Sequence, residues 1–319
     1  MKIAHILQQA IALRATDLHL QEGRPPMWRL QQALVPCRGE LVQRIDIMEW
    51  LQELGYTYVE GTVISAAFSC PHGVRCRLHV SSEWAGLHGA LRLLYPLETL
   101  PPDRDQALLE QLAMLRDGLV LVTGPTGCGK TTTLWQMLQA ANRQRPCHIL
   151  TLEDPIEYVI PSEQALLSLR EYGTHFSSFA DGVKQALRQD PDILLVGEMR
   201  DVETMDAALT AAEMGHLVFS TLHTRSTAQA VTRLIGAFGA GRQEEIRQRL
   251  SFVLQAILAQ ERVYADGKLR IHREILIATP AVCQLIRSGK DHQLQSVLQT
   301  SSHVGMRTME QARSQGKCL

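Results

Sequence analysis

The apolar residues at the start of the chain follow helical and strand spacings in turn. Helical spacing occurs at residues 3–14 and again at 46–54. Strand patterns, with extended or alternating side chains, occur at 18–20, 74–80 and 89–94. A proline-containing segment at 95–103 then interrupts the regular patterns. The first part of the chain is therefore predicted to be a small α+β domain followed by a linker.

A different pattern follows the linker. Continuous apolar runs of strand length alternate with helical patterns, which is typical of a parallel sheet covered on both faces. The runs lie at 119–123, 148–152, 193–196 and 217–222, and the helical patterns lie at about 131–143, 178–189 and 203–214. From about residue 243 the pattern is mainly helical, with a strand pair at 261–277. The predicted organisation is α/β, with domains at 1–96 and 104–319 and a linker at 97–103.

Composition narrows the class of protein. The 319 residues carry 32 Lys+Arg and 33 Asp+Glu, and this near-neutral balance argues against an intrinsic nucleic-acid binder. The seven cysteines form no CxxC pair, which disfavours a structural zinc site and favours free thiols in a reducing compartment. The N-terminus lacks a signal-peptide pattern, and no apolar run is long enough to span a bilayer. We expect a cytoplasmic protein that meets membranes only through partners.

One segment has a specific chemical meaning. The sequence GPTGCGKT, residues 124–131, matches the phosphate-binding loop GxxxxGK[ST] and lies between a predicted strand and a predicted helix. Its backbone N–H groups and the helix N-terminus would bind phosphates, while Lys130 would reach the β- and γ-phosphates and Thr131 would hold Mg²⁺. The predicted nucleotide-binding residues here are Gly124, Pro125, Thr126, Gly127, Cys128, Gly129, Lys130, Thr131 and Thr132. Cys128 either packs as a small residue or, with a thiol pKa lowered by the helix N-terminus, acts as a redox brake.

Acidic residues follow two of the predicted strands. Glu198 comes after 193–196, at the strand end that faces the nucleotide crevice of such folds, so it is a candidate to polarise water and to bind Mg²⁺. In TLEDPIEY, Glu153, Asp154 and Glu157 cluster after another strand and would repel one another unless a cation such as Mg²⁺ offsets them. Glu157 and then Glu153 are the catalytic candidates of this cluster. A capped turn with solvated acids is the structural alternative.

Two histidines flank the predicted strand 217–222. His216 precedes the strand and His223 follows it. A neutral imidazole can donate a hydrogen bond to a γ-phosphate, so both are candidate sensors of the nucleotide. A purely structural role for each is the alternative.

Taken together, these motifs resemble one family. GPTGCGKTTT resembles its Walker A motif, TLEDPIEY its Asp box, LVGEMRD its Walker B motif and GHLVFSTLHT its His box. The family is that of the secretion-type ATPases of type II secretion and type IV pili, and the nearest branch is that of the PilT-like pilus-retraction ATPases. The segments ATDLHLQEGRPPMWRL and LIRSGKDHQLQSVLQTSSHVGMRTME are also similar to that branch. The resemblance covers roughly residues 5–312.

The resemblance implies an architecture and a function. It implies a PAS-like N-terminal domain, a RecA-like ATPase domain with a helical C-terminal part, and a homo-hexamer. It places ATP and Mg²⁺ between the two domains, with arginines of the N-terminal domain completing the site. By position these are Arg75, Arg77 and Arg92, for which surface strand arginines are the alternative. Residues 95–103 would be the hinge, and the partner would be a platform protein of the inner membrane.

Departures from the family pattern lie outside the nucleotide motifs. Ala85 stands where relatives carry an arginine, and the motif AIRNLIRE reads AVCQLIRS, with Cys283 and Ser288. The segment before Arg262 also differs. We therefore expect an ATP-hydrolysing motor for pilus retraction and twitching-type motility, with divergence that favours a paralogue of the principal motor. The alternatives are a secretion or pilus-assembly ATPase, a DNA translocase and a nucleotide-binding regulator.

Overall fold

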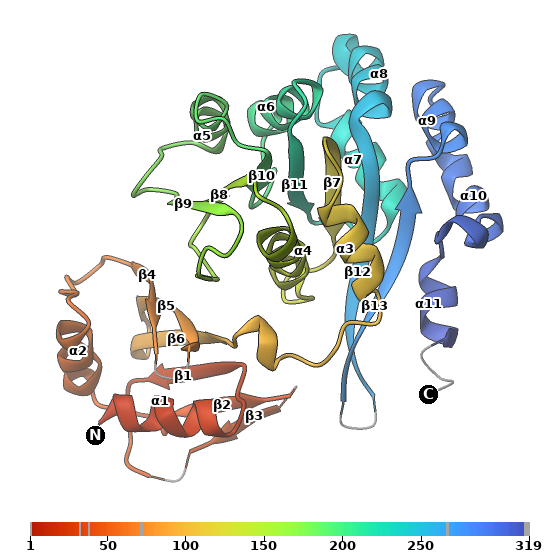
Figure 1. The fold of residues 1–319 in the computed structure, drawn as a ribbon. Helices are drawn as coiled ribbons and strands as arrows, with labels where there is room; N and C mark the ends of the chain where they lie inside the picture. The colour runs from red at the N-terminus through yellow and green to blue at the C-terminus, as the bar shows by residue number, and fades with distance from the viewer. Residues whose placement is uncertain (1, 32, 38, 71–72, 266–267, 316–319) are drawn as a thin grey trace. The chain divides into compact units, whose positions relative to one another are not determined.

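The chain folds into two compact units. The computed structural model describes residues 2–31, 33–37, 39–70, 73–265 and 268–315 (Figure 1). The first unit comprises Met1–Pro101 together with Glu157–Val159, and the second comprises Pro102–Ile156 and Ile160–Leu319. The division after Pro101 falls inside the linker predicted at 97–103, where the short 3₁₀ helix η2 (Leu97–Thr99) lies.

The first unit is a six-stranded sheet with two helices. Its sheet order is β3-β2-β1-β6-β5-β4, and all neighbouring strands are antiparallel. The elements are α1 (Ile3–Ala12), β1 (Asp17–Gln21), β2 (Met27–Leu30), β3 (Ala33–Pro36), α2 (Arg44–Glu53), β4 (Ile64–Ser69), β5 (Arg75–Glu83) and β6 (Gly86–Leu94). The sequence pattern predicted both helices and three of these strands but missed β2, β3 and β4. Because β2 and β3 bury no side chain fully, they show no apolar alternation.

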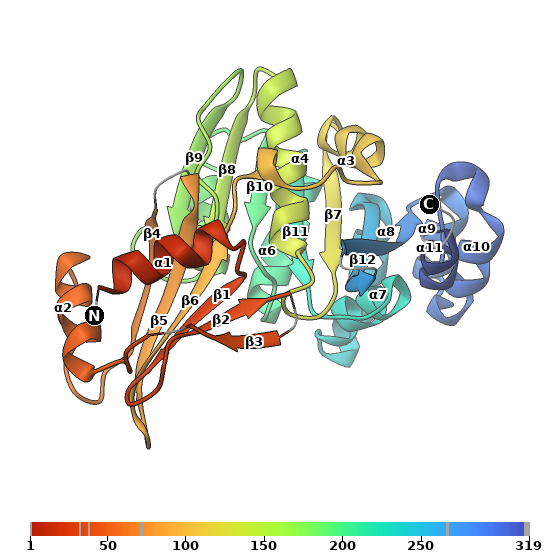
Figure 2. The same cartoon turned by 90° about the horizontal axis from the view of Figure 1, so that it is seen from below.

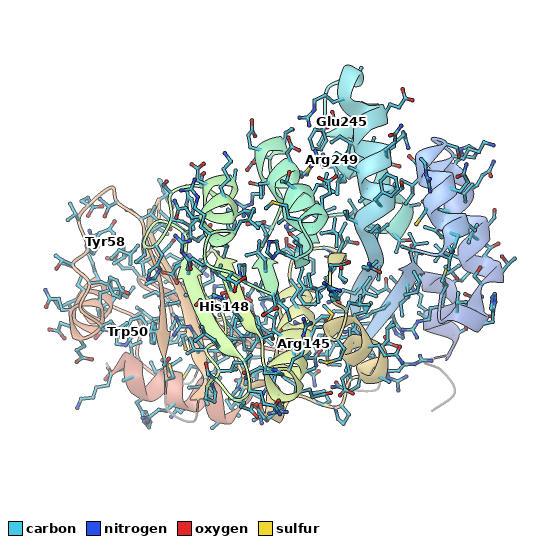
Figure 3. The ribbon with its side chains drawn as sticks, turned by 45° about the horizontal axis from the view of Figure 1, so that its top comes forward. Trp50, Tyr58, Arg145, His148, Glu245 and Arg249 are labelled. Atoms are coloured by element: carbon cyan, nitrogen blue, oxygen red, sulfur yellow. The ribbon has the colours of Figure 1, made fainter. Side chains whose placement is uncertain are left out.

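One face of this sheet forms the core of the first unit. Alternate residues of β5, among them Cys76 and Leu78, are buried and belong to one cluster with side chains of α1 and α2. Helix α1 packs against β1 and α2 (Figure 2). The aromatic side chains of Trp50 and Tyr58, labelled in Figure 3, belong to the same cluster. The other face of β5 and β6 keeps its polar side chains exposed or half-buried.

The second unit contains the predicted parallel sheet. Its order is β13-β12-β7-β11-β10-β8-β9, and every neighbouring pair is parallel except β12 with β13. The strands are β7 (Gly118–Thr123), β8 (His148–Glu153), β9 (Leu166–Glu171), β10 (Ile193–Val196), β11 (Leu217–Leu222), β12 (Leu254–Ala265) and β13 (Lys268–Ile277). The helices are α3 (Gln106–Ala113), α4 (Lys130–Gln144), α5 (Phe179–Ala186), α6 (Val202–Glu213), α7 (Thr227–Gly236), α8 (Gln243–Val253), α9 (Pro280–Arg287), α10 (Leu294–Thr300) and α11 (Met309–Gln315).

The main difference from the sequence prediction is the length of β12. The strand pair was predicted at 261–277, but β12 already begins at Leu254 and pairs in parallel with β7. This extension makes the strand pair part of the central sheet, next to the strand that precedes the phosphate-binding loop. The sequence pattern also missed β9, α3 and α7.

Helices cover both faces of the central sheet. Leu119 and Leu121 of β7 belong to a buried cluster with side chains of α5, α6, α7 and α8. Because side chains alternate along a strand, Val120 and Val122 point to the opposite face, where α4 packs against β7 and β11. Within the described residues, no helix combines the length and the apolar character needed to cross a membrane.

Candidate active site

The phosphate-binding loop connects β7 to α4. Its tip, residues 125–127, is exposed, whereas its two ends are buried or half-buried. At Gly124, which has a φ of 146°, an added Cβ would lie 2.3 Å from the backbone oxygen of Gln260. Gly129 has a left-handed conformation, with a φ of 90°, as the N-cap of α4. The glycines therefore allow the loop to curl tightly against β12, with the N-terminus of α4 behind it.

The lysine of this loop is held by backbone oxygens. Lys130 Nζ donates hydrogen bonds to Gly124 O at 2.9 Å and to Pro125 O at 3.1 Å, so the ammonium group lies over the loop. Thr131 follows it in the first turn of α4 and is half-buried, as is Thr132. The structure thus brings the predicted phosphate-binding residues together in one loop.

Cys128 packs beneath the loop. Its side chain is 2% exposed. Burial raises the pKa of its thiol in spite of the neighbouring Lys130 charge. The redox-brake hypothesis required a lowered pKa and an accessible thiolate. The burial of Cys128 and the raised pKa of its thiol favour the packing explanation, because desolvation outweighs the opposing charge of Lys130. The redox brake stays a hypothesis.

Glu198 and His223 lie at the same edge of the sheet as the loop. Strands β7, β11 and β10 are parallel neighbours, so their carboxyl ends share one edge. Glu198 follows β10, His223 follows β11, and their Oε2 and Nε2 atoms lie 3.4 Å apart. The other carboxylate oxygen of Glu198 pairs with Arg200, an exposed residue. The Glu198 side chain remains 16% exposed, so this carboxylate is accessible to water.

His216 lies at the opposite edge. It precedes β11, whose six residues span about 20 Å at the usual rise of a strand. Its Nδ1 donates to Pro191 O at 2.7 Å, in the turn before β10. The hypothesis that His216 senses the γ-phosphate in its own chain is therefore corrected, because the amino and carboxyl ends of a parallel strand lie at different edges.

The acids of TLEDPIEY have different surroundings. Glu153 is buried at the end of β8, where its Oε2 accepts a hydrogen bond from Trp135 Nε1 of α4 at 3.0 Å. Glu157 Oε1 lies 3.9 Å from Arg77 Nη1 within the first unit. Asp154, between them in sequence, is exposed. The catalytic roles of Glu157 and Glu153 stay predictions.

The three arginines predicted from the family resemblance share one face of the first unit. Arg75 and Arg77 alternate along β5, and Arg77 is the cross-strand partner of Arg92 on β6. Arg92 Nε donates to Asp17 Oδ1 at 3.1 Å, and Arg75 Nη1 donates to Ser69 Oγ at 3.2 Å. Arg77 and Arg92 are exposed and Arg75 is half-buried, which leaves a basic row on the polar face of the sheet.

Sequence reasoning missed residues of the β12–β13 hairpin that contact the loop. Gln260 Nε2 donates to Cys128 O at 2.8 Å, and Arg262 Nη1 donates to Gly127 O at 3.3 Å. Arg273 of β13 donates from Nε to Gln260 Oε1 at 3.3 Å. The sequence offers no clear signal for either residue: Gln260 ends the apolar run AILA and begins the polar segment QER, and Arg273 stands among other polar residues in RIHREILI.

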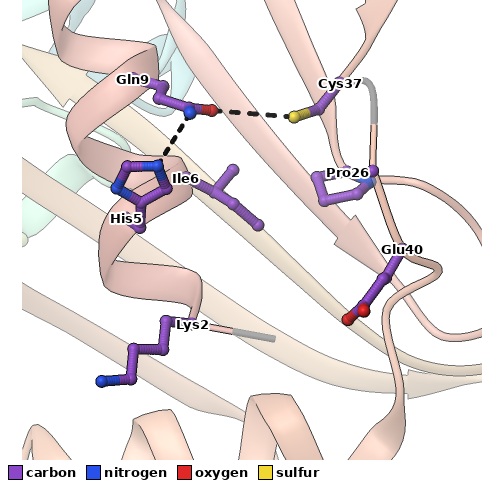
Figure 4. Close-up of a pocket in the computed structure, with 8 residues that line it drawn as sticks. Lys2, His5, Ile6, Gln9, Pro26, Cys37 and Glu40 are labelled. Atoms are coloured by element: carbon purple, nitrogen blue, oxygen red, sulfur yellow. Dashed lines mark hydrogen bonds between the residues drawn. The ribbon is translucent and has the colours of Figure 1, made fainter.

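The first unit contains a pocket of its own. It lies beside α1 and is lined by Lys2, His5, Ile6, Gln9, Pro26, Cys37, Gly39 and Glu40. In Figure 4 the amide of Gln9 lies between the His5 ring and the Cys37 thiol, at 3.0 and 3.9 Å. None of the predicted site residues lines it.

The residues at the carboxyl edge fit a magnesium nucleotide. Lys130 and the amides at the start of α4 supply positive charge for phosphates, and Thr131 and Glu198 supply the oxygen ligands that Mg²⁺ prefers. No group of three or more His, Cys, Asp or Glu side chains that could hold a metal occurs among the described residues.

A parallel sheet with this loop and these strand-end residues defines a P-loop nucleotide hydrolase. Residues 93–265 match the family described as "Type II/IV secretion system protein". The chain is 39% identical over 321 residues to the "Type IV pilus retractation ATPase PilT" of Pseudomonas aeruginosa, covering 97% of this chain and 92% of that protein. It is 40% identical to the "Uncharacterized protein YggR" of Escherichia coli (strain K12), covering 98% of this chain and 97% of that protein.

A solved structure agrees with these similarities. The "Crystal Structure of the Pilus Retraction Motor PilT and Bound ADP" matches with a TM-score of 0.81 and 36% identity, over 98% of this chain and 92% of that chain. The chain therefore belongs to the type II/IV secretion system protein family, as a PilT-like member, and it is an ATPase. The predicted fold class and family resemblance are confirmed.

Proposed function

We propose that this ATPase is a Mg²⁺-dependent motor, acting as a homo-hexamer, that drives type IV pilus retraction and twitching-type motility. One observation carries the proposal: the loop with Lys130 and Thr131 shares its edge of the sheet with Glu198 and His223. That arrangement supplies phosphate binding, water activation and a γ-phosphate contact in one place. The similarity to the pilus retraction motor supports the assignment of the work that hydrolysis drives.

Each residue at this edge has a chemical task in the proposed reaction. Lys130 and the loop amides bind the β- and γ-phosphates, which positions the terminal phosphoryl group. Thr131 and Glu198 would hold Mg²⁺, whose charge offsets that of the phosphate oxygens. Glu198 accepts a hydrogen bond from the attacking water and orients it. His223 donates a hydrogen bond to the γ-phosphate, and its contact with Glu198 would then report whether that phosphate is present.

The remaining candidates act around this centre. Arg75, Arg77 and Arg92 would neutralise charge on the γ-phosphate in the transition state, either in their own chain or in a hexamer neighbour. Glu157 and Glu153 would help to place water, Glu153 through its fixed position beside α4. The segment 95–103 would act as the hinge, since hinges lie in connecting segments. A platform protein of the inner membrane would receive the motion, with the ATPase on the cytoplasmic side.

The biochemical part of this proposal is tested with purified protein. We expect phosphate release from ATP that stops on chelation of Mg²⁺ and returns when Mg²⁺ is added. Lys130→Ala should lower the rate by about 10²–10³-fold, as loss of a preorganised charge partner does. Lys184→Ala is the matched control, because Lys184 is exposed on α5 and pairs only at the surface with Asp181. Equal activity of Lys130→Ala and the wild type would refute the site.

The biological part is tested in the host. Deletion should leave excess surface pili and abolish twitching if the motor retracts filaments. The alternative, an assembly or secretion ATPase of the same family, predicts loss of filaments or of a secreted protein. Complementation with Glu198→Ala should fail, and rescue by that variant would show that hydrolysis is not the task. Stimulation of phosphate release by DNA would instead favour a translocase.

A further inference from the structure

A chain of buried polar side chains runs from the linker to the phosphate-binding loop. It begins at Asp103, the last residue of the predicted linker, and passes through Arg273 of β13 and Gln260 of β12. It ends at the carbonyl of Cys128 in the loop, which accepts a hydrogen bond from Gln260 Nε2 at 2.8 Å. All of these residues belong to the second unit.

Arg273 is the centre of this chain. Its side chain is 1% exposed, and two of its nitrogens donate to the two carboxylate oxygens of Asp103 at 2.6 and 2.7 Å. Asp105 accepts a further bond from Nη1 at 3.1 Å and also pairs with Arg307. A planar guanidinium can make all these contacts at once, whereas an ammonium group cannot.

Two contacts carry the position of Arg273 to the loop and its helix. Gln260 is 2% exposed. Its Oε1 accepts hydrogen bonds from Arg273 Nε and from the Thr133 hydroxyl. Its Nε2 donates a hydrogen bond to Cys128 O in the loop. Arg273 Nη2 also donates to Thr133 Oγ1 at 2.9 Å, in the first turn of α4. Gln260 therefore holds the loop before Lys130, and Arg273 and Gln260 together hold Thr133 in the helix after it.

The backbone of β12 also limits the loop. The oxygen of Gln260 occupies the space that a side chain at Gly124 would need. A shift of Gln260 would therefore change the shape of the loop at both Gly124 and Cys128. A network that served only to anchor the hairpin would have no need of a hydrogen bond to a backbone carbonyl of the phosphate-binding loop.

We propose that Arg273 is a positioning residue for ATP binding: through Gln260 and Thr133 it holds the phosphate-binding loop in its binding shape, and through Asp103 it ties that shape to the end of the linker. This inference rests on the proposed ATPase site. If the linker moved Asp103, Arg273 would move with it and would displace Gln260 and Thr133. Motion of the linker would therefore change the shape of the loop and its affinity for nucleotide.

The test uses two variants of the full-length chain. Arg273→Lys keeps the charge opposite Asp103 and Asp105 but loses the forked contacts to Gln260 and Thr133. Gln260→Met keeps the side-chain length and leaves the Arg273–Asp103 pair in place, so it serves even if Arg273→Lys fails to fold. The matched control is Arg249→Lys, since Arg249 of α8, labelled in Figure 3, is likewise held by carboxylates, those of Asp206 and Glu213 on α6.

Two readouts separate positioning from general stability. In nucleotide-free protein, the amides of residues 128–133 should exchange hydrogen about tenfold faster in Arg273→Lys and Gln260→Met than in the wild type, the effect of losing one buried hydrogen bond. The Kd for ADP should rise about tenfold, while kcat at saturating ATP changes by less than about threefold. The double variant should show less than the sum of the two effects, because both act through one path.

The outcomes are distinguishable. Loop exchange and Kd within about twofold of the wild type, or equal effects in Arg249→Lys, would overturn the inference. Asp103→Asn tests the last link, and an unchanged loop in that variant would overturn the tie to the linker. Failure of the wild type to bind ADP or to release phosphate would instead refute the proposed function, and the exchange measurement on nucleotide-free protein would still decide whether Arg273 orders the loop.

Discussion

The two edges of the central sheet use the same residue type for different purposes. At the carboxyl edge, His223 is half exposed and lies 3.4 Å from the accessible carboxylate of Glu198. At the amino edge, His216 donates to the backbone oxygen of Pro191, and His148 lies within hydrogen-bond distance of Gln189 O and Ser168 Oγ. In Figure 3 His148 appears on β8 within the second unit.

This comparison shows what separates a histidine that is a candidate for nucleotide contact from a structural one. At the amino edge, Nδ1 of each histidine lies at hydrogen-bond distance from a backbone carbonyl of the turn between α5 and β10, Pro191 O for His216 and Gln189 O for His148. At the carboxyl edge, the histidine contacts an ionisable side chain beside a loop that can bind phosphates. The direction of the strands, rather than the residue type, decides which role is possible.

The largest expected effect is at Glu198. Glu198→Gln replaces the carboxylate that polarises water with a neutral amide and should lower kcat by about 10²–10⁴-fold, with ADP binding retained. Glu203→Gln, an exposed acid in the first turn of α6, is the matched control and should leave the rate unchanged. Steady-state phosphate release and ADP titration give the two numbers. A rate for Glu198→Gln near that of the wild type would show that Glu198 at the carboxyl edge takes no part in hydrolysis.

Substitution of the two histidines tests the comparison directly. His223→Ala should lower kcat about tenfold, as loss of one transition-state hydrogen bond does, with little change in thermal stability. His216→Ala should instead lower the free energy of unfolding by about 1 kcal/mol, through the lost bond to Pro191 O, and leave kcat intact. Calorimetry and phosphate release should give opposite rankings for the two variants. The same ranking in both assays would contradict the division of roles.

The ion pair between Asp103 and Arg273 should make the free energy of unfolding depend on pH under acidic conditions. Burial alone would raise the pKa of Asp103, but the hydrogen bonds and the charge of Arg273 hold it below its usual value. A carboxylate with a lower pKa in the folded state than in the unfolded chain stabilises the fold above the unfolded pKa, about 4. That contribution is lost as the pH falls through the folded pKa. We expect the free energy of unfolding, measured at assay points between pH 6 and pH 2, to fall less steeply for Asp103→Asn than for the wild type.

The smallest effect concerns the motif that contains Glu198. Asp201 of LVGEMRD is the N-cap of α6, where its Oδ1 accepts from Thr204 N at 2.7 Å. Asp201→Ala should lower the free energy of unfolding by about 1 kcal/mol and leave kcat almost unchanged. A loss of rate as large as that of Glu198→Gln would show that Asp201 also serves the reaction.

Local segments made much of this protein predictable. The phosphate-binding loop is one continuous stretch, so its glycines, Lys130 and Thr131 could be identified from the order of residues alone, together with the task expected of each. The parallel strands were also predictable, since strands buried on both faces are continuous apolar runs. Strands β2 and β3 were missed because their side chains are not fully buried, and the start of β12 was missed because LQAIL reads equally well as helix.

The sequence by itself determined that the chain carries a phosphate-binding loop at 124–132 and that Glu198 follows a buried strand. Only the tertiary structure decided that His223 and not His216 shares the edge of that loop, that Glu153 pairs with Trp135, and that Arg273 contacts Gln260 beside the loop. The reason is physical. A loop motif is encoded by adjacent residues, whereas Arg273 and Asp103 are 170 residues apart, and their contact exists only once β12 and β13 have joined the sheet beside β7.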